Sequence, residues 1–369
     1  MRSNLWAVLL VICLLTAGCA STEESPTAPV APALLPAPLY YLAEEGGGAS
    51  LWRVEADGAT QVQIADCCIL AYAVSPASGW VAYLPDETTL VVADALGGEV
   101  ATVDIATVGY STQSDTALAW APDGSRVALG GERGVYAYAP GSGNLTQLFD
   151  GSEDSTVVAP LSHDAWSPDG RTLLIVNSEP DRDMLGMLAV ESGELVMSRL
   201  AAGRRFTWSL DSQVVYVSSN FWGMMGFLPS LLVFDPLANE PTLLITVDTD
   251  DEGLLVRYVD AAQEGPDGLL YYFYGEEREV EVGVDTGRLS MTRSNRDGIT
   301  GRERLRDDVY VAVDEVLWAP DMSLALIAGA DPWLENQTGA VTLLPADGQE
   351  PAVVLPFVGY GLQWGPAGE

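Results

Sequence analysis

The stretch Trp166-Ser-Pro-Asp-Gly170, followed by the apolar run Thr172-Leu-Leu-Ile-Val176, decides how this chain folds, because the same pairing recurs along its length. Similar stretches are Trp120-Ala-Pro-Asp-Gly124, Trp208-Ser-Leu-Asp211, Gly265-Pro-Asp-Gly268 and Trp318-Ala-Pro-Asp321, with weaker ones at Val74-Ser-Pro76 and Trp364-Gly-Pro366. The anchor positions 76, 122, 168, 210, 266, 320 and 366 lie 46, 46, 42, 56, 54 and 46 residues apart. A period of roughly 40–50 residues predicts a series of similar supersecondary units.

Each unit has the pattern of four short strands. The motif ends the first strand and forms a turn, in which proline presets one backbone angle and glycine accepts the left-handed one. The apolar runs that follow, such as Val214-Val-Tyr-Val217, have the length of a strand rather than of a helix. In the unit anchored at Leu210, the motif has leucine in place of proline and lacks the following glycine. We therefore expect a less sharp turn in this unit. The units together predict an all-β fold, a β-propeller.

The two ends of the chain are incomplete in complementary ways. Residues 39–66 supply three strand-like runs without a first strand, and Val358 to Pro366 supply a first strand without a second. Joined, they form one blade shared between the N- and C-terminal strands, which hides sheet edges. The prediction is seven blades of about 47 residues over residues 39–369. Six or eight blades follow if the long units between 210 and 320 divide differently.

The motif, its place before a β-rich strand and the shared terminal blade resemble the TolB-type propeller repeats, which are relatives of the WD repeat. The resemblance covers nearly all of residues 39–369. It implies a seven-bladed propeller domain but is poor for function, because this fold carries many unrelated activities.

Residues 1–19 have the pattern of a secretory signal, with Arg2 ahead of an apolar run from Leu5 to Leu15. Its end, Leu15-Thr-Ala-Gly-Cys19, resembles the lipobox of bacterial lipoproteins, which implies a lipidated Cys19 as mature N-terminus. An ordinary cleaved signal peptide is the alternative. Residues 20–38 are rich in proline and alanine and predict a tether. We therefore expect a lipid-anchored protein on the extracytoplasmic side of the cell envelope, in the periplasm or at the cell surface.

The charge balance restricts the partners. The chain carries 52 acidic and 17 basic residues, a formal net charge of −35, and every basic residue is arginine. Nucleic-acid binding requires a cationic surface, so it is excluded, and contact with a membrane is expected through the lipid anchor only. Such acidity also favours a monomer.

Catalytic signals are scarce. His163 is the only histidine, and because neighbours on a strand point to alternate faces, Ser162, His163 and Asp164 are not expected to form a relay. One histidine and few cysteines argue against a zinc or copper site. Cys67 and Cys68 are a candidate vicinal disulfide, the alternative being a structural or free pair. We predict no catalytic residue, no metal and no cofactor.

Two segments exceed what a minimal blade needs. The first interrupts the second and third strands of the unit anchored at Leu210 with aromatic and methionine side chains, which are typical of adaptable binding surfaces. The second, residues 293–306, holds five of the 17 arginines. We expect both to flank one channel mouth and to form a binding rim. Its candidate residues are Phe221, Trp222, Met224, Met225, Phe227, Arg296, Arg302, Arg304 and Arg306. Alternatively, the apolar residues plug the channel and the arginines pair with nearby carboxylates.

The predicted function is therefore that of a lipid-anchored, extracytoplasmic scaffold, not an enzyme, that binds a protein or an anionic ligand through its rim loops. The alternative is an enzyme at the channel mouth, such as a lyase, a lactonase or a quinone-dependent oxidoreductase. Such an enzyme needs carboxylates, a metal or a cofactor that converge in the channel. Three or more inward carboxylates around one point would favour it.

Overall fold

The computed structural model describes residues 33–110, 117–151, 157–179, 182–201, 205–219, 230–236, 240–246, 248–250, 253–278, 288–310, 313, 315–328 and 340–367. Within these ranges the regular elements are 29 strands, and no helix occurs among them. Accordingly, none of the described residues belongs to a helix that could cross a membrane. The signal segment, the tether up to residue 32 and Cys19 lie outside the described part of the chain.

Two of the sheets have four strands each and contain the first part of the chain. The first has the order β29-β1-β2-β3 and the second the order β4-β5-β6-β7. Their strands are β29 (Tyr360–Trp364), β1 (Leu39–Glu45), β2 (Gly48–Val54), β3 (Gln61–Ala65), β4 (Ala71–Val74), β5 (Val81–Asp86), β6 (Thr89–Ala93) and β7 (Glu99–Asp104).

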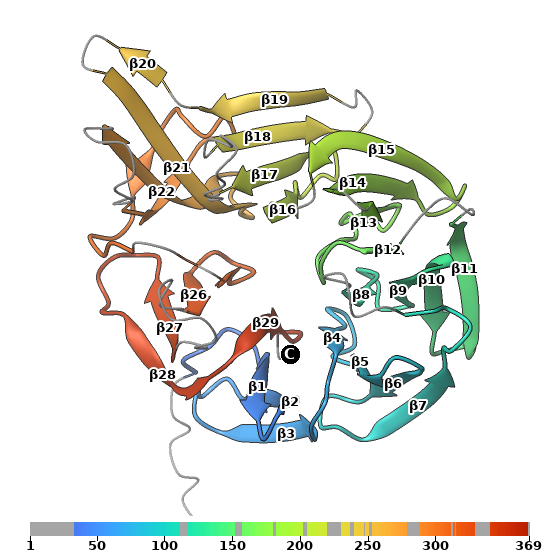
Figure 1. Ribbon diagram of the computed structural model, residues 1–369. Helices are drawn as coiled ribbons and strands as arrows, with labels where there is room; N and C mark the ends of the chain where they lie inside the picture. Colours follow the sequence, from blue (N-terminus) through green and yellow to red (C-terminus); the bar gives the residue numbers. More distant parts are fainter. Residues whose placement is uncertain are drawn as a thin grey trace, which may run out of the picture. The chain divides into compact units, whose positions relative to one another are not determined.

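An eight-stranded sheet follows in Figure 1. It contains β8 (Ala119–Trp120), β9 (Val127–Gly131), β10 (Gly134–Ala139), β11 (Asn144–Asp150), β12 (Val157–Pro160), β13 (Thr172–Glu179), β14 (Arg182–Ala189) and β15 (Glu194–Ala201). It spans two repeat units, which are connected because β12 pairs with both β9 and β13.

A nine-stranded sheet likewise spans two units, connected by the pairing of β17 with β21 at Ser219 and Val259. Its strands are β16 (Arg205–Trp208), β17 (Val215–Ser219), β18 (Ser230–Asp235), β19 (Glu240–Ile245), β20 (Asp248–Asp250), β21 (Gly253–Glu264), β22 (Leu270–Arg278), β23 (Ser290–Ser294) and β24 (Glu303–Arg304). The last sheet has four strands, β25 (Glu315–Trp318), β26 (Leu324–Ala328), β27 (Ala340–Pro345) and β28 (Val353–Val358).

The C-terminal strand closes the fold onto the N-terminal one. β29 pairs antiparallel with β1, with Leu39 opposite Trp364 and Tyr40 opposite Gln363. The Gly365 N–H extends this pairing by donating to the Pro38 carbonyl oxygen over 2.7 Å. The predicted all-β propeller with a blade shared between both ends is thereby confirmed, whereas the count of seven blades stays a prediction.

The tryptophan of the motif links each unit to the one before it. Its indole N–H donates to a backbone carbonyl of the preceding unit. This hydrogen bond gives the polar N–H of the buried ring a partner. The pairs are Trp120 with Ala73 (3.0 Å), Trp166 with Ala119 (2.9 Å), Trp208 with Ala165 (3.1 Å), Trp318 with Ala261 (2.7 Å) and Trp364 with Trp318 (2.8 Å). The motif is thus a device for joining neighbouring units as well as for turning the chain.

The turn survives where the motif lacks glycine. Gly170 adopts a φ of 70° and donates its N–H to the Ser167 carbonyl over 2.8 Å. In the unit anchored at Leu210, Ser212 takes the same place with a φ of 61° and donates to the Ser209 carbonyl over 2.9 Å. The left-handed conformation is unfavourable for a residue with a Cβ, so the surrounding contacts impose the turn.

Candidate functional site

Ionisable side chains from four units lie on or directly after the strands β12, β16, β21 and β25. They are His163, Asp164, Arg205, Asp260 and Glu315, and we call them the axial cluster. His163, Arg205 and Glu315 each stand three positions before the tryptophan of their motif. Their equivalent position in the repeat brings them close enough together that the charges of His163 and Arg205 act on Glu315.

His163 and Asp164 form a pair within one turn. The imidazole Nε2 lies 3.1 Å from the Asp164 carboxylate, and the two side chains are 32% and 68% exposed. The expectation that neighbours would point apart is wrong here, because residues 161–164 form a turn rather than a strand. Burial lowers the pKa of His163, but the charge and hydrogen bond of Asp164 and the charge of Glu315 outweigh it, so the pKa is raised.

The pKa of Asp164, the partner of His163, shifts in the opposite direction. Desolvation by the surrounding protein raises the pKa of the Asp164 carboxyl, but the charge and hydrogen bond of His163 prevail, so this pKa lies below its ordinary value. Both shifts favour the charged pair of imidazolium and carboxylate. Because Asp164 is largely exposed, water screens the pair, and its contribution to stability is small.

Arg205 connects three parts of the chain. Its Nε lies 2.9 Å from the Asp260 carboxylate, and its Nη2 donates to the Val313 carbonyl over 2.9 Å. The Asp260 side chain is 4% exposed and also accepts the Ala261 N–H over 2.7 Å. A buried carboxylate with both a guanidinium and a backbone donor is a satisfied one. The Arg205 side chain is 32% exposed, as is that of His163, so both are partly accessible to solvent.

Glu315 ties the cluster to the closing strand. Its carboxylate accepts the backbone N–H groups of Gly361, over 2.9 Å, and of Leu362, both on β29. Burial raises the pKa of Glu315, although these two hydrogen bonds and the charges of His163 and Arg205 act against it. The Tyr72 hydroxyl donates to the Gly361 carbonyl from the other side. The first strand of the 320 unit, β29 and β4 are therefore held together by polar contacts.

The remaining units have small residues at the position three before the anchor tryptophan or its equivalent. These are Ala71, Ala117, Ala261 and Gly361. One arc of the ring thus carries both cationic and anionic groups, and the other arc carries little side-chain volume. The axial cluster was missed from the sequence because each unit was read separately. Alignment of the copies on their tryptophans would have shown histidine, arginine and glutamate at one repeat position.

The cluster contains three carboxylates, those of Asp164, Asp260 and Glu315, and each has a hydrogen-bonding partner within the chain. Among the described residues, no group of three histidine, cysteine, aspartate or glutamate side chains is arranged to hold a metal ion. Chemically, the cluster combines a guanidinium, an imidazole with raised pKa and carboxylate oxygens.

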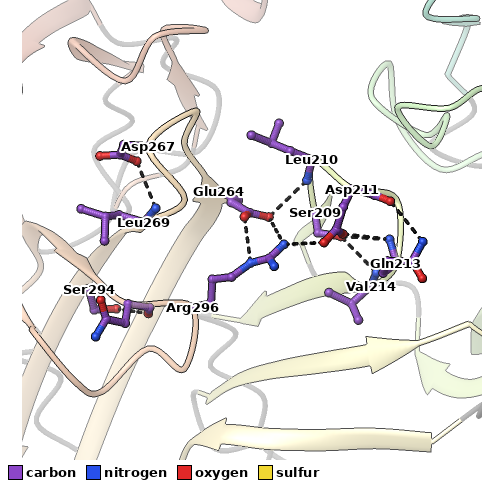
Figure 2. A network of polar contacts seen from close by, with 11 residues as sticks. Ser209, Leu210, Asp211, Gln213, Val214, Glu264, Asp267, Leu269, Ser294 and Arg296 are labelled. Atoms are coloured by element: carbon purple, nitrogen blue, oxygen red, sulfur yellow. Dashed lines mark hydrogen bonds and ion pairs between the residues drawn. The ribbon is translucent and has the colours of Figure 1, made fainter.

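The arginine segment is engaged in contacts of its own. Figure 2 shows Arg296 between Glu264 and Asp211. Its Nε lies 2.8 Å from Glu264 Oε1, and its Nη2 lies 2.8 Å from Glu264 Oε2 and 3.0 Å from Asp211 Oδ2. The Ser209 hydroxyl and Arg296 hold the pKa of Asp211 below its ordinary value, against the opposing effect of burial. Arg296 thus clamps two neighbouring units.

The other three arginines also contact their own chain. The Arg302 guanidinium lies 4.0 Å from the centre of the Tyr274 ring and donates to the Gly298 carbonyl. Arg304 donates to the carbonyl oxygens of Arg306 and Asp307. Arg306 is buried and donates to Asp308 and to the Pro345 and Glu350 carbonyls. Pairing within the chain accounts for these side chains, and a role in binding stays a prediction.

The two segments of the predicted rim do not belong to one end of the strands. Arg296 lies in the turn between β23 and β24 and contacts Asp211 in the turn between β16 and β17. The aromatic segment connects the opposite ends of β17 and β18, at Ser219 and Ser230. A shared mouth is therefore wrong for Arg296, because the third turn of a meander lies at the same edge as the first. Phe221, Trp222, Met224, Met225 and Phe227 themselves lie outside the described residues.

Comparison with known proteins supports the fold. Two solved oligogalacturonate lyases match with TM-scores of 0.54: one in complex with manganese, 8% identical over 83% of this chain and 81% of its own, and one from Vibrio parahaemolyticus, 9% identical over 86% and 84%. A putative TolB from Agrobacterium tumefaciens also matches, 19% identical over 71% of this chain and 87% of its own, with a TM-score of 0.46. No protein-family model and no curated protein matches the chain. At these identities the two matches with TM-scores of 0.54 show the β-propeller fold alone.

Proposed function

We propose that this chain is an extracytoplasmic propeller, anchored by lipid on Cys19, that binds a protein or a ligand at the mouth where the axial cluster lies. The observation that carries this proposal is the arrangement of the cluster. Units of one arc supply Arg205, His163 and Asp164 in fixed positions, and the other arc has only Ala71, Ala117 and Gly361 at the equivalent positions. Such an arc offers charged contacts opposite small side chains.

The fixed geometry favours recognition. Arg205 is held by Asp260 and the Val313 carbonyl, so its guanidinium loses little freedom when a ligand binds. A planar guanidinium with donors in fixed positions suits a carboxylate or a similar oxyanion. The Arg205 guanidinium would therefore match an anionic group of the predicted protein or ligand partner. The segment from Phe221 to Phe227 connects strands at the same end and would supply apolar contact around it.

The export signal and the lipobox-like Leu15-Thr-Ala-Gly-Cys19 support the location in the cell envelope. With residues 20–38 as a tether, the propeller would stand clear of the membrane to which its lipid belongs. Replacement of Cys19 by serine should release the protein from washed membranes. Retention of the Cys19→Ser variant would contradict the anchor.

The alternative function, an enzyme at the mouth, is supported by the three carboxylates of the axial cluster and by the pair of His163 and Asp164. In the His163 and Asp164 pair the carboxylate orients the imidazole and raises its pKa, which is how a general base is prepared. The pair would serve a binding site equally well as a charged donor. Turnover of a polyanionic glycan or a lactone that is lost in His163→Gln would establish the enzyme instead.

The binding proposal is tested by chemical cross-linking of the full-length lipoprotein in native membranes, followed by pull-down. The variant His163→Gln with Asp164→Asn removes the charged pair at partly exposed positions, so the fold should survive. Arg171→Gln is the matched control, since Arg171 is 85% exposed in the turn after the motif, at the other end of the strand. We expect the cross-linked partner with the wild type and the control and its loss from the pair variant. Equal capture by all three would overturn the proposal.

A further inference from the structure

Cys67 and Cys68 lie in the connection between β3 and β4 with both side chains exposed and their Sγ atoms 2.8 Å apart. Adjacent side chains of an extended chain point to opposite sides. Here they meet because Cys68 has a φ of 68°, in the left-handed region that residues with a Cβ seldom adopt. The backbone is thus held in a conformation that brings two neighbouring thiols into contact.

Several contacts impose this conformation. The Cys67 N–H donates to the Asp66 carboxylate over 3.0 Å, and the Ile69 N–H donates to the Ala49 carbonyl over 2.9 Å. Gly48, at the start of β2, lies against Cys68. A Cβ at residue 48 would stand 2.9 Å from the Cys68 backbone nitrogen and 3.2 Å from its Sγ. The unfavourable φ is therefore maintained from both sides of the thiol pair, and strain that is maintained in this way often marks a functional position.

We propose that Cys67 and Cys68 form a vicinal disulfide in the exported protein. One thiolate attacks the disulfide of an extracytoplasmic thiol–disulfide oxidoreductase to give a mixed disulfide. The neighbouring thiol, after losing its proton, then displaces the oxidoreductase. Two thiols lose two protons and two electrons as one sulfur–sulfur bond forms, and the oxidant is reduced to its dithiol. The contact between the two sulfurs places the second nucleophile at the mixed disulfide as soon as that forms.

The bond has a clear physical consequence. Two exposed thiols in an oxidising compartment would link chains to one another or to other exported proteins. Closing the ring within two adjacent residues removes both thiols from exchange and ties the conformation of the connection between β3 and β4. It stabilises little through the unfolded state, because no loop lies between the two cysteines. The inference rests on export but not on the binding partner.

A single tryptic peptide tests the proposal. Cleavage after Arg53 and Arg126 gives the peptide from Val54 to Arg126, which contains these two cysteines and no other. Full-length protein is isolated from the cell envelope and alkylated before digestion. Without reduction, we expect this peptide to carry no alkyl group and to be two hydrogen masses lighter than the dithiol form. After reduction and a second alkylation, we expect it to carry two alkyl groups. Two alkyl groups without reduction, or a disulfide to another peptide, would overturn the proposal.

Export and oxidation are distinguished in the same digest, since acyl chains on Cys19 report passage through the envelope. Acylated protein with free thiols refutes the disulfide while the anchor stands. In a second arm, the purified protein is incubated with an oxidised thiol–disulfide oxidoreductase, and failure to lose both thiols refutes the proposal whatever the compartment. In Cys67→Ser the remaining thiol should instead appear alkylated or in disulfide-linked dimers.

Discussion

The contact between the units anchored at Leu210 and Pro266 (the 210 and 266 units) allows a test of how altered copies of the motif are held together, because two departures from the motif meet there. Leu210 stands where the other six copies have proline, and Glu264 stands where most copies have tryptophan. The Leu210 N–H donates to Glu264 Oε2 over 3.1 Å. Proline has no N–H, so this hydrogen bond exists only because the motif is altered at both positions. We expect Leu210 and Glu264 to be energetically coupled.

The size of the coupling follows from the burial of the acceptor. The Glu264 side chain is 5% exposed, and a hydrogen bond to a buried charged group contributes about 1.5–3 kcal/mol. Leu210→Pro removes the donor while little packing is lost, since Leu210 is 53% exposed. The turn itself tolerates proline, as the other copies show. Leu210→Pro should therefore lower the free energy of unfolding by about 1.5–3 kcal/mol.

A double-mutant cycle measured by urea unfolding isolates this bond. In the Glu264→Ala background no acceptor is left, so Leu210→Pro should be neutral or stabilise by about 0.4–1 kcal/mol through the stiffer unfolded chain. Leu210→Ala, which keeps the N–H, is the control and should change stability by about 0.5 kcal/mol or less. An equal cost of Leu210→Pro in both backgrounds would refute the coupling.

Three further predictions concern the axial cluster and the tryptophan links. His163 is the only histidine, so one imidazole signal in proton NMR reports its pKa, and we expect a midpoint above about 6.5 that falls in Asp164→Asn. Because the folded pKa of His163 is raised, the stabilisation from its protonation is fully present below about pH 6.5 and is lost as the pH rises through the folded value; an unchanged midpoint in Asp164→Asn would contradict this. Glu315→Ala leaves two N–H groups of β29 without their acceptor and should cost about 1–3 kcal/mol in urea unfolding, and Glu315→Gln clearly less, so equal losses would argue against these bonds. Trp166→Phe keeps an aromatic ring but removes the donor to the preceding unit, and thermal unfolding should show a loss of about 1 kcal/mol or more, whereas no loss would remove the indole link from the account.

The parts of the fold that depend on local chemistry could be predicted. The motif of Trp166 to Gly170 specifies a turn from residues adjacent in sequence, so its copies indicated the repeat and its period. The closure of β29 on β1 followed from the missing strands at the two ends. Both rest on patterns that the backbone enforces wherever they occur. The pairing of Leu39 with Trp364 confirms this reasoning.

The contacts between units could not be predicted in the same way. The arginines from Arg296 to Arg306 are conspicuous by composition, but composition does not say at which end of a strand a side chain lies. Arg296 is in the turn between β23 and β24, beside Asp211 and Glu264. His163 and Asp164 were misjudged because strand alternation was assumed where the chain turns. In each case the position of the side chain depends on a partner distant in sequence or on a short stretch of irregular backbone.

The departures from the motif make one junction of the ring different from the others. Where the motif is intact, a neutral indole N–H donates to a carbonyl, a bond that neither salt nor pH alters directly. Between the 210 and 266 units, the Trp208 indole still contacts the preceding unit, but the next link consists of Glu264, Leu210 and Arg296. Salt that screens the ion pairs of Arg296 with Glu264 and Asp211 weakens this link but leaves the neutral indole bonds unchanged. In concentrated salt the ring should therefore loosen at this junction ahead of the junctions that the tryptophans link.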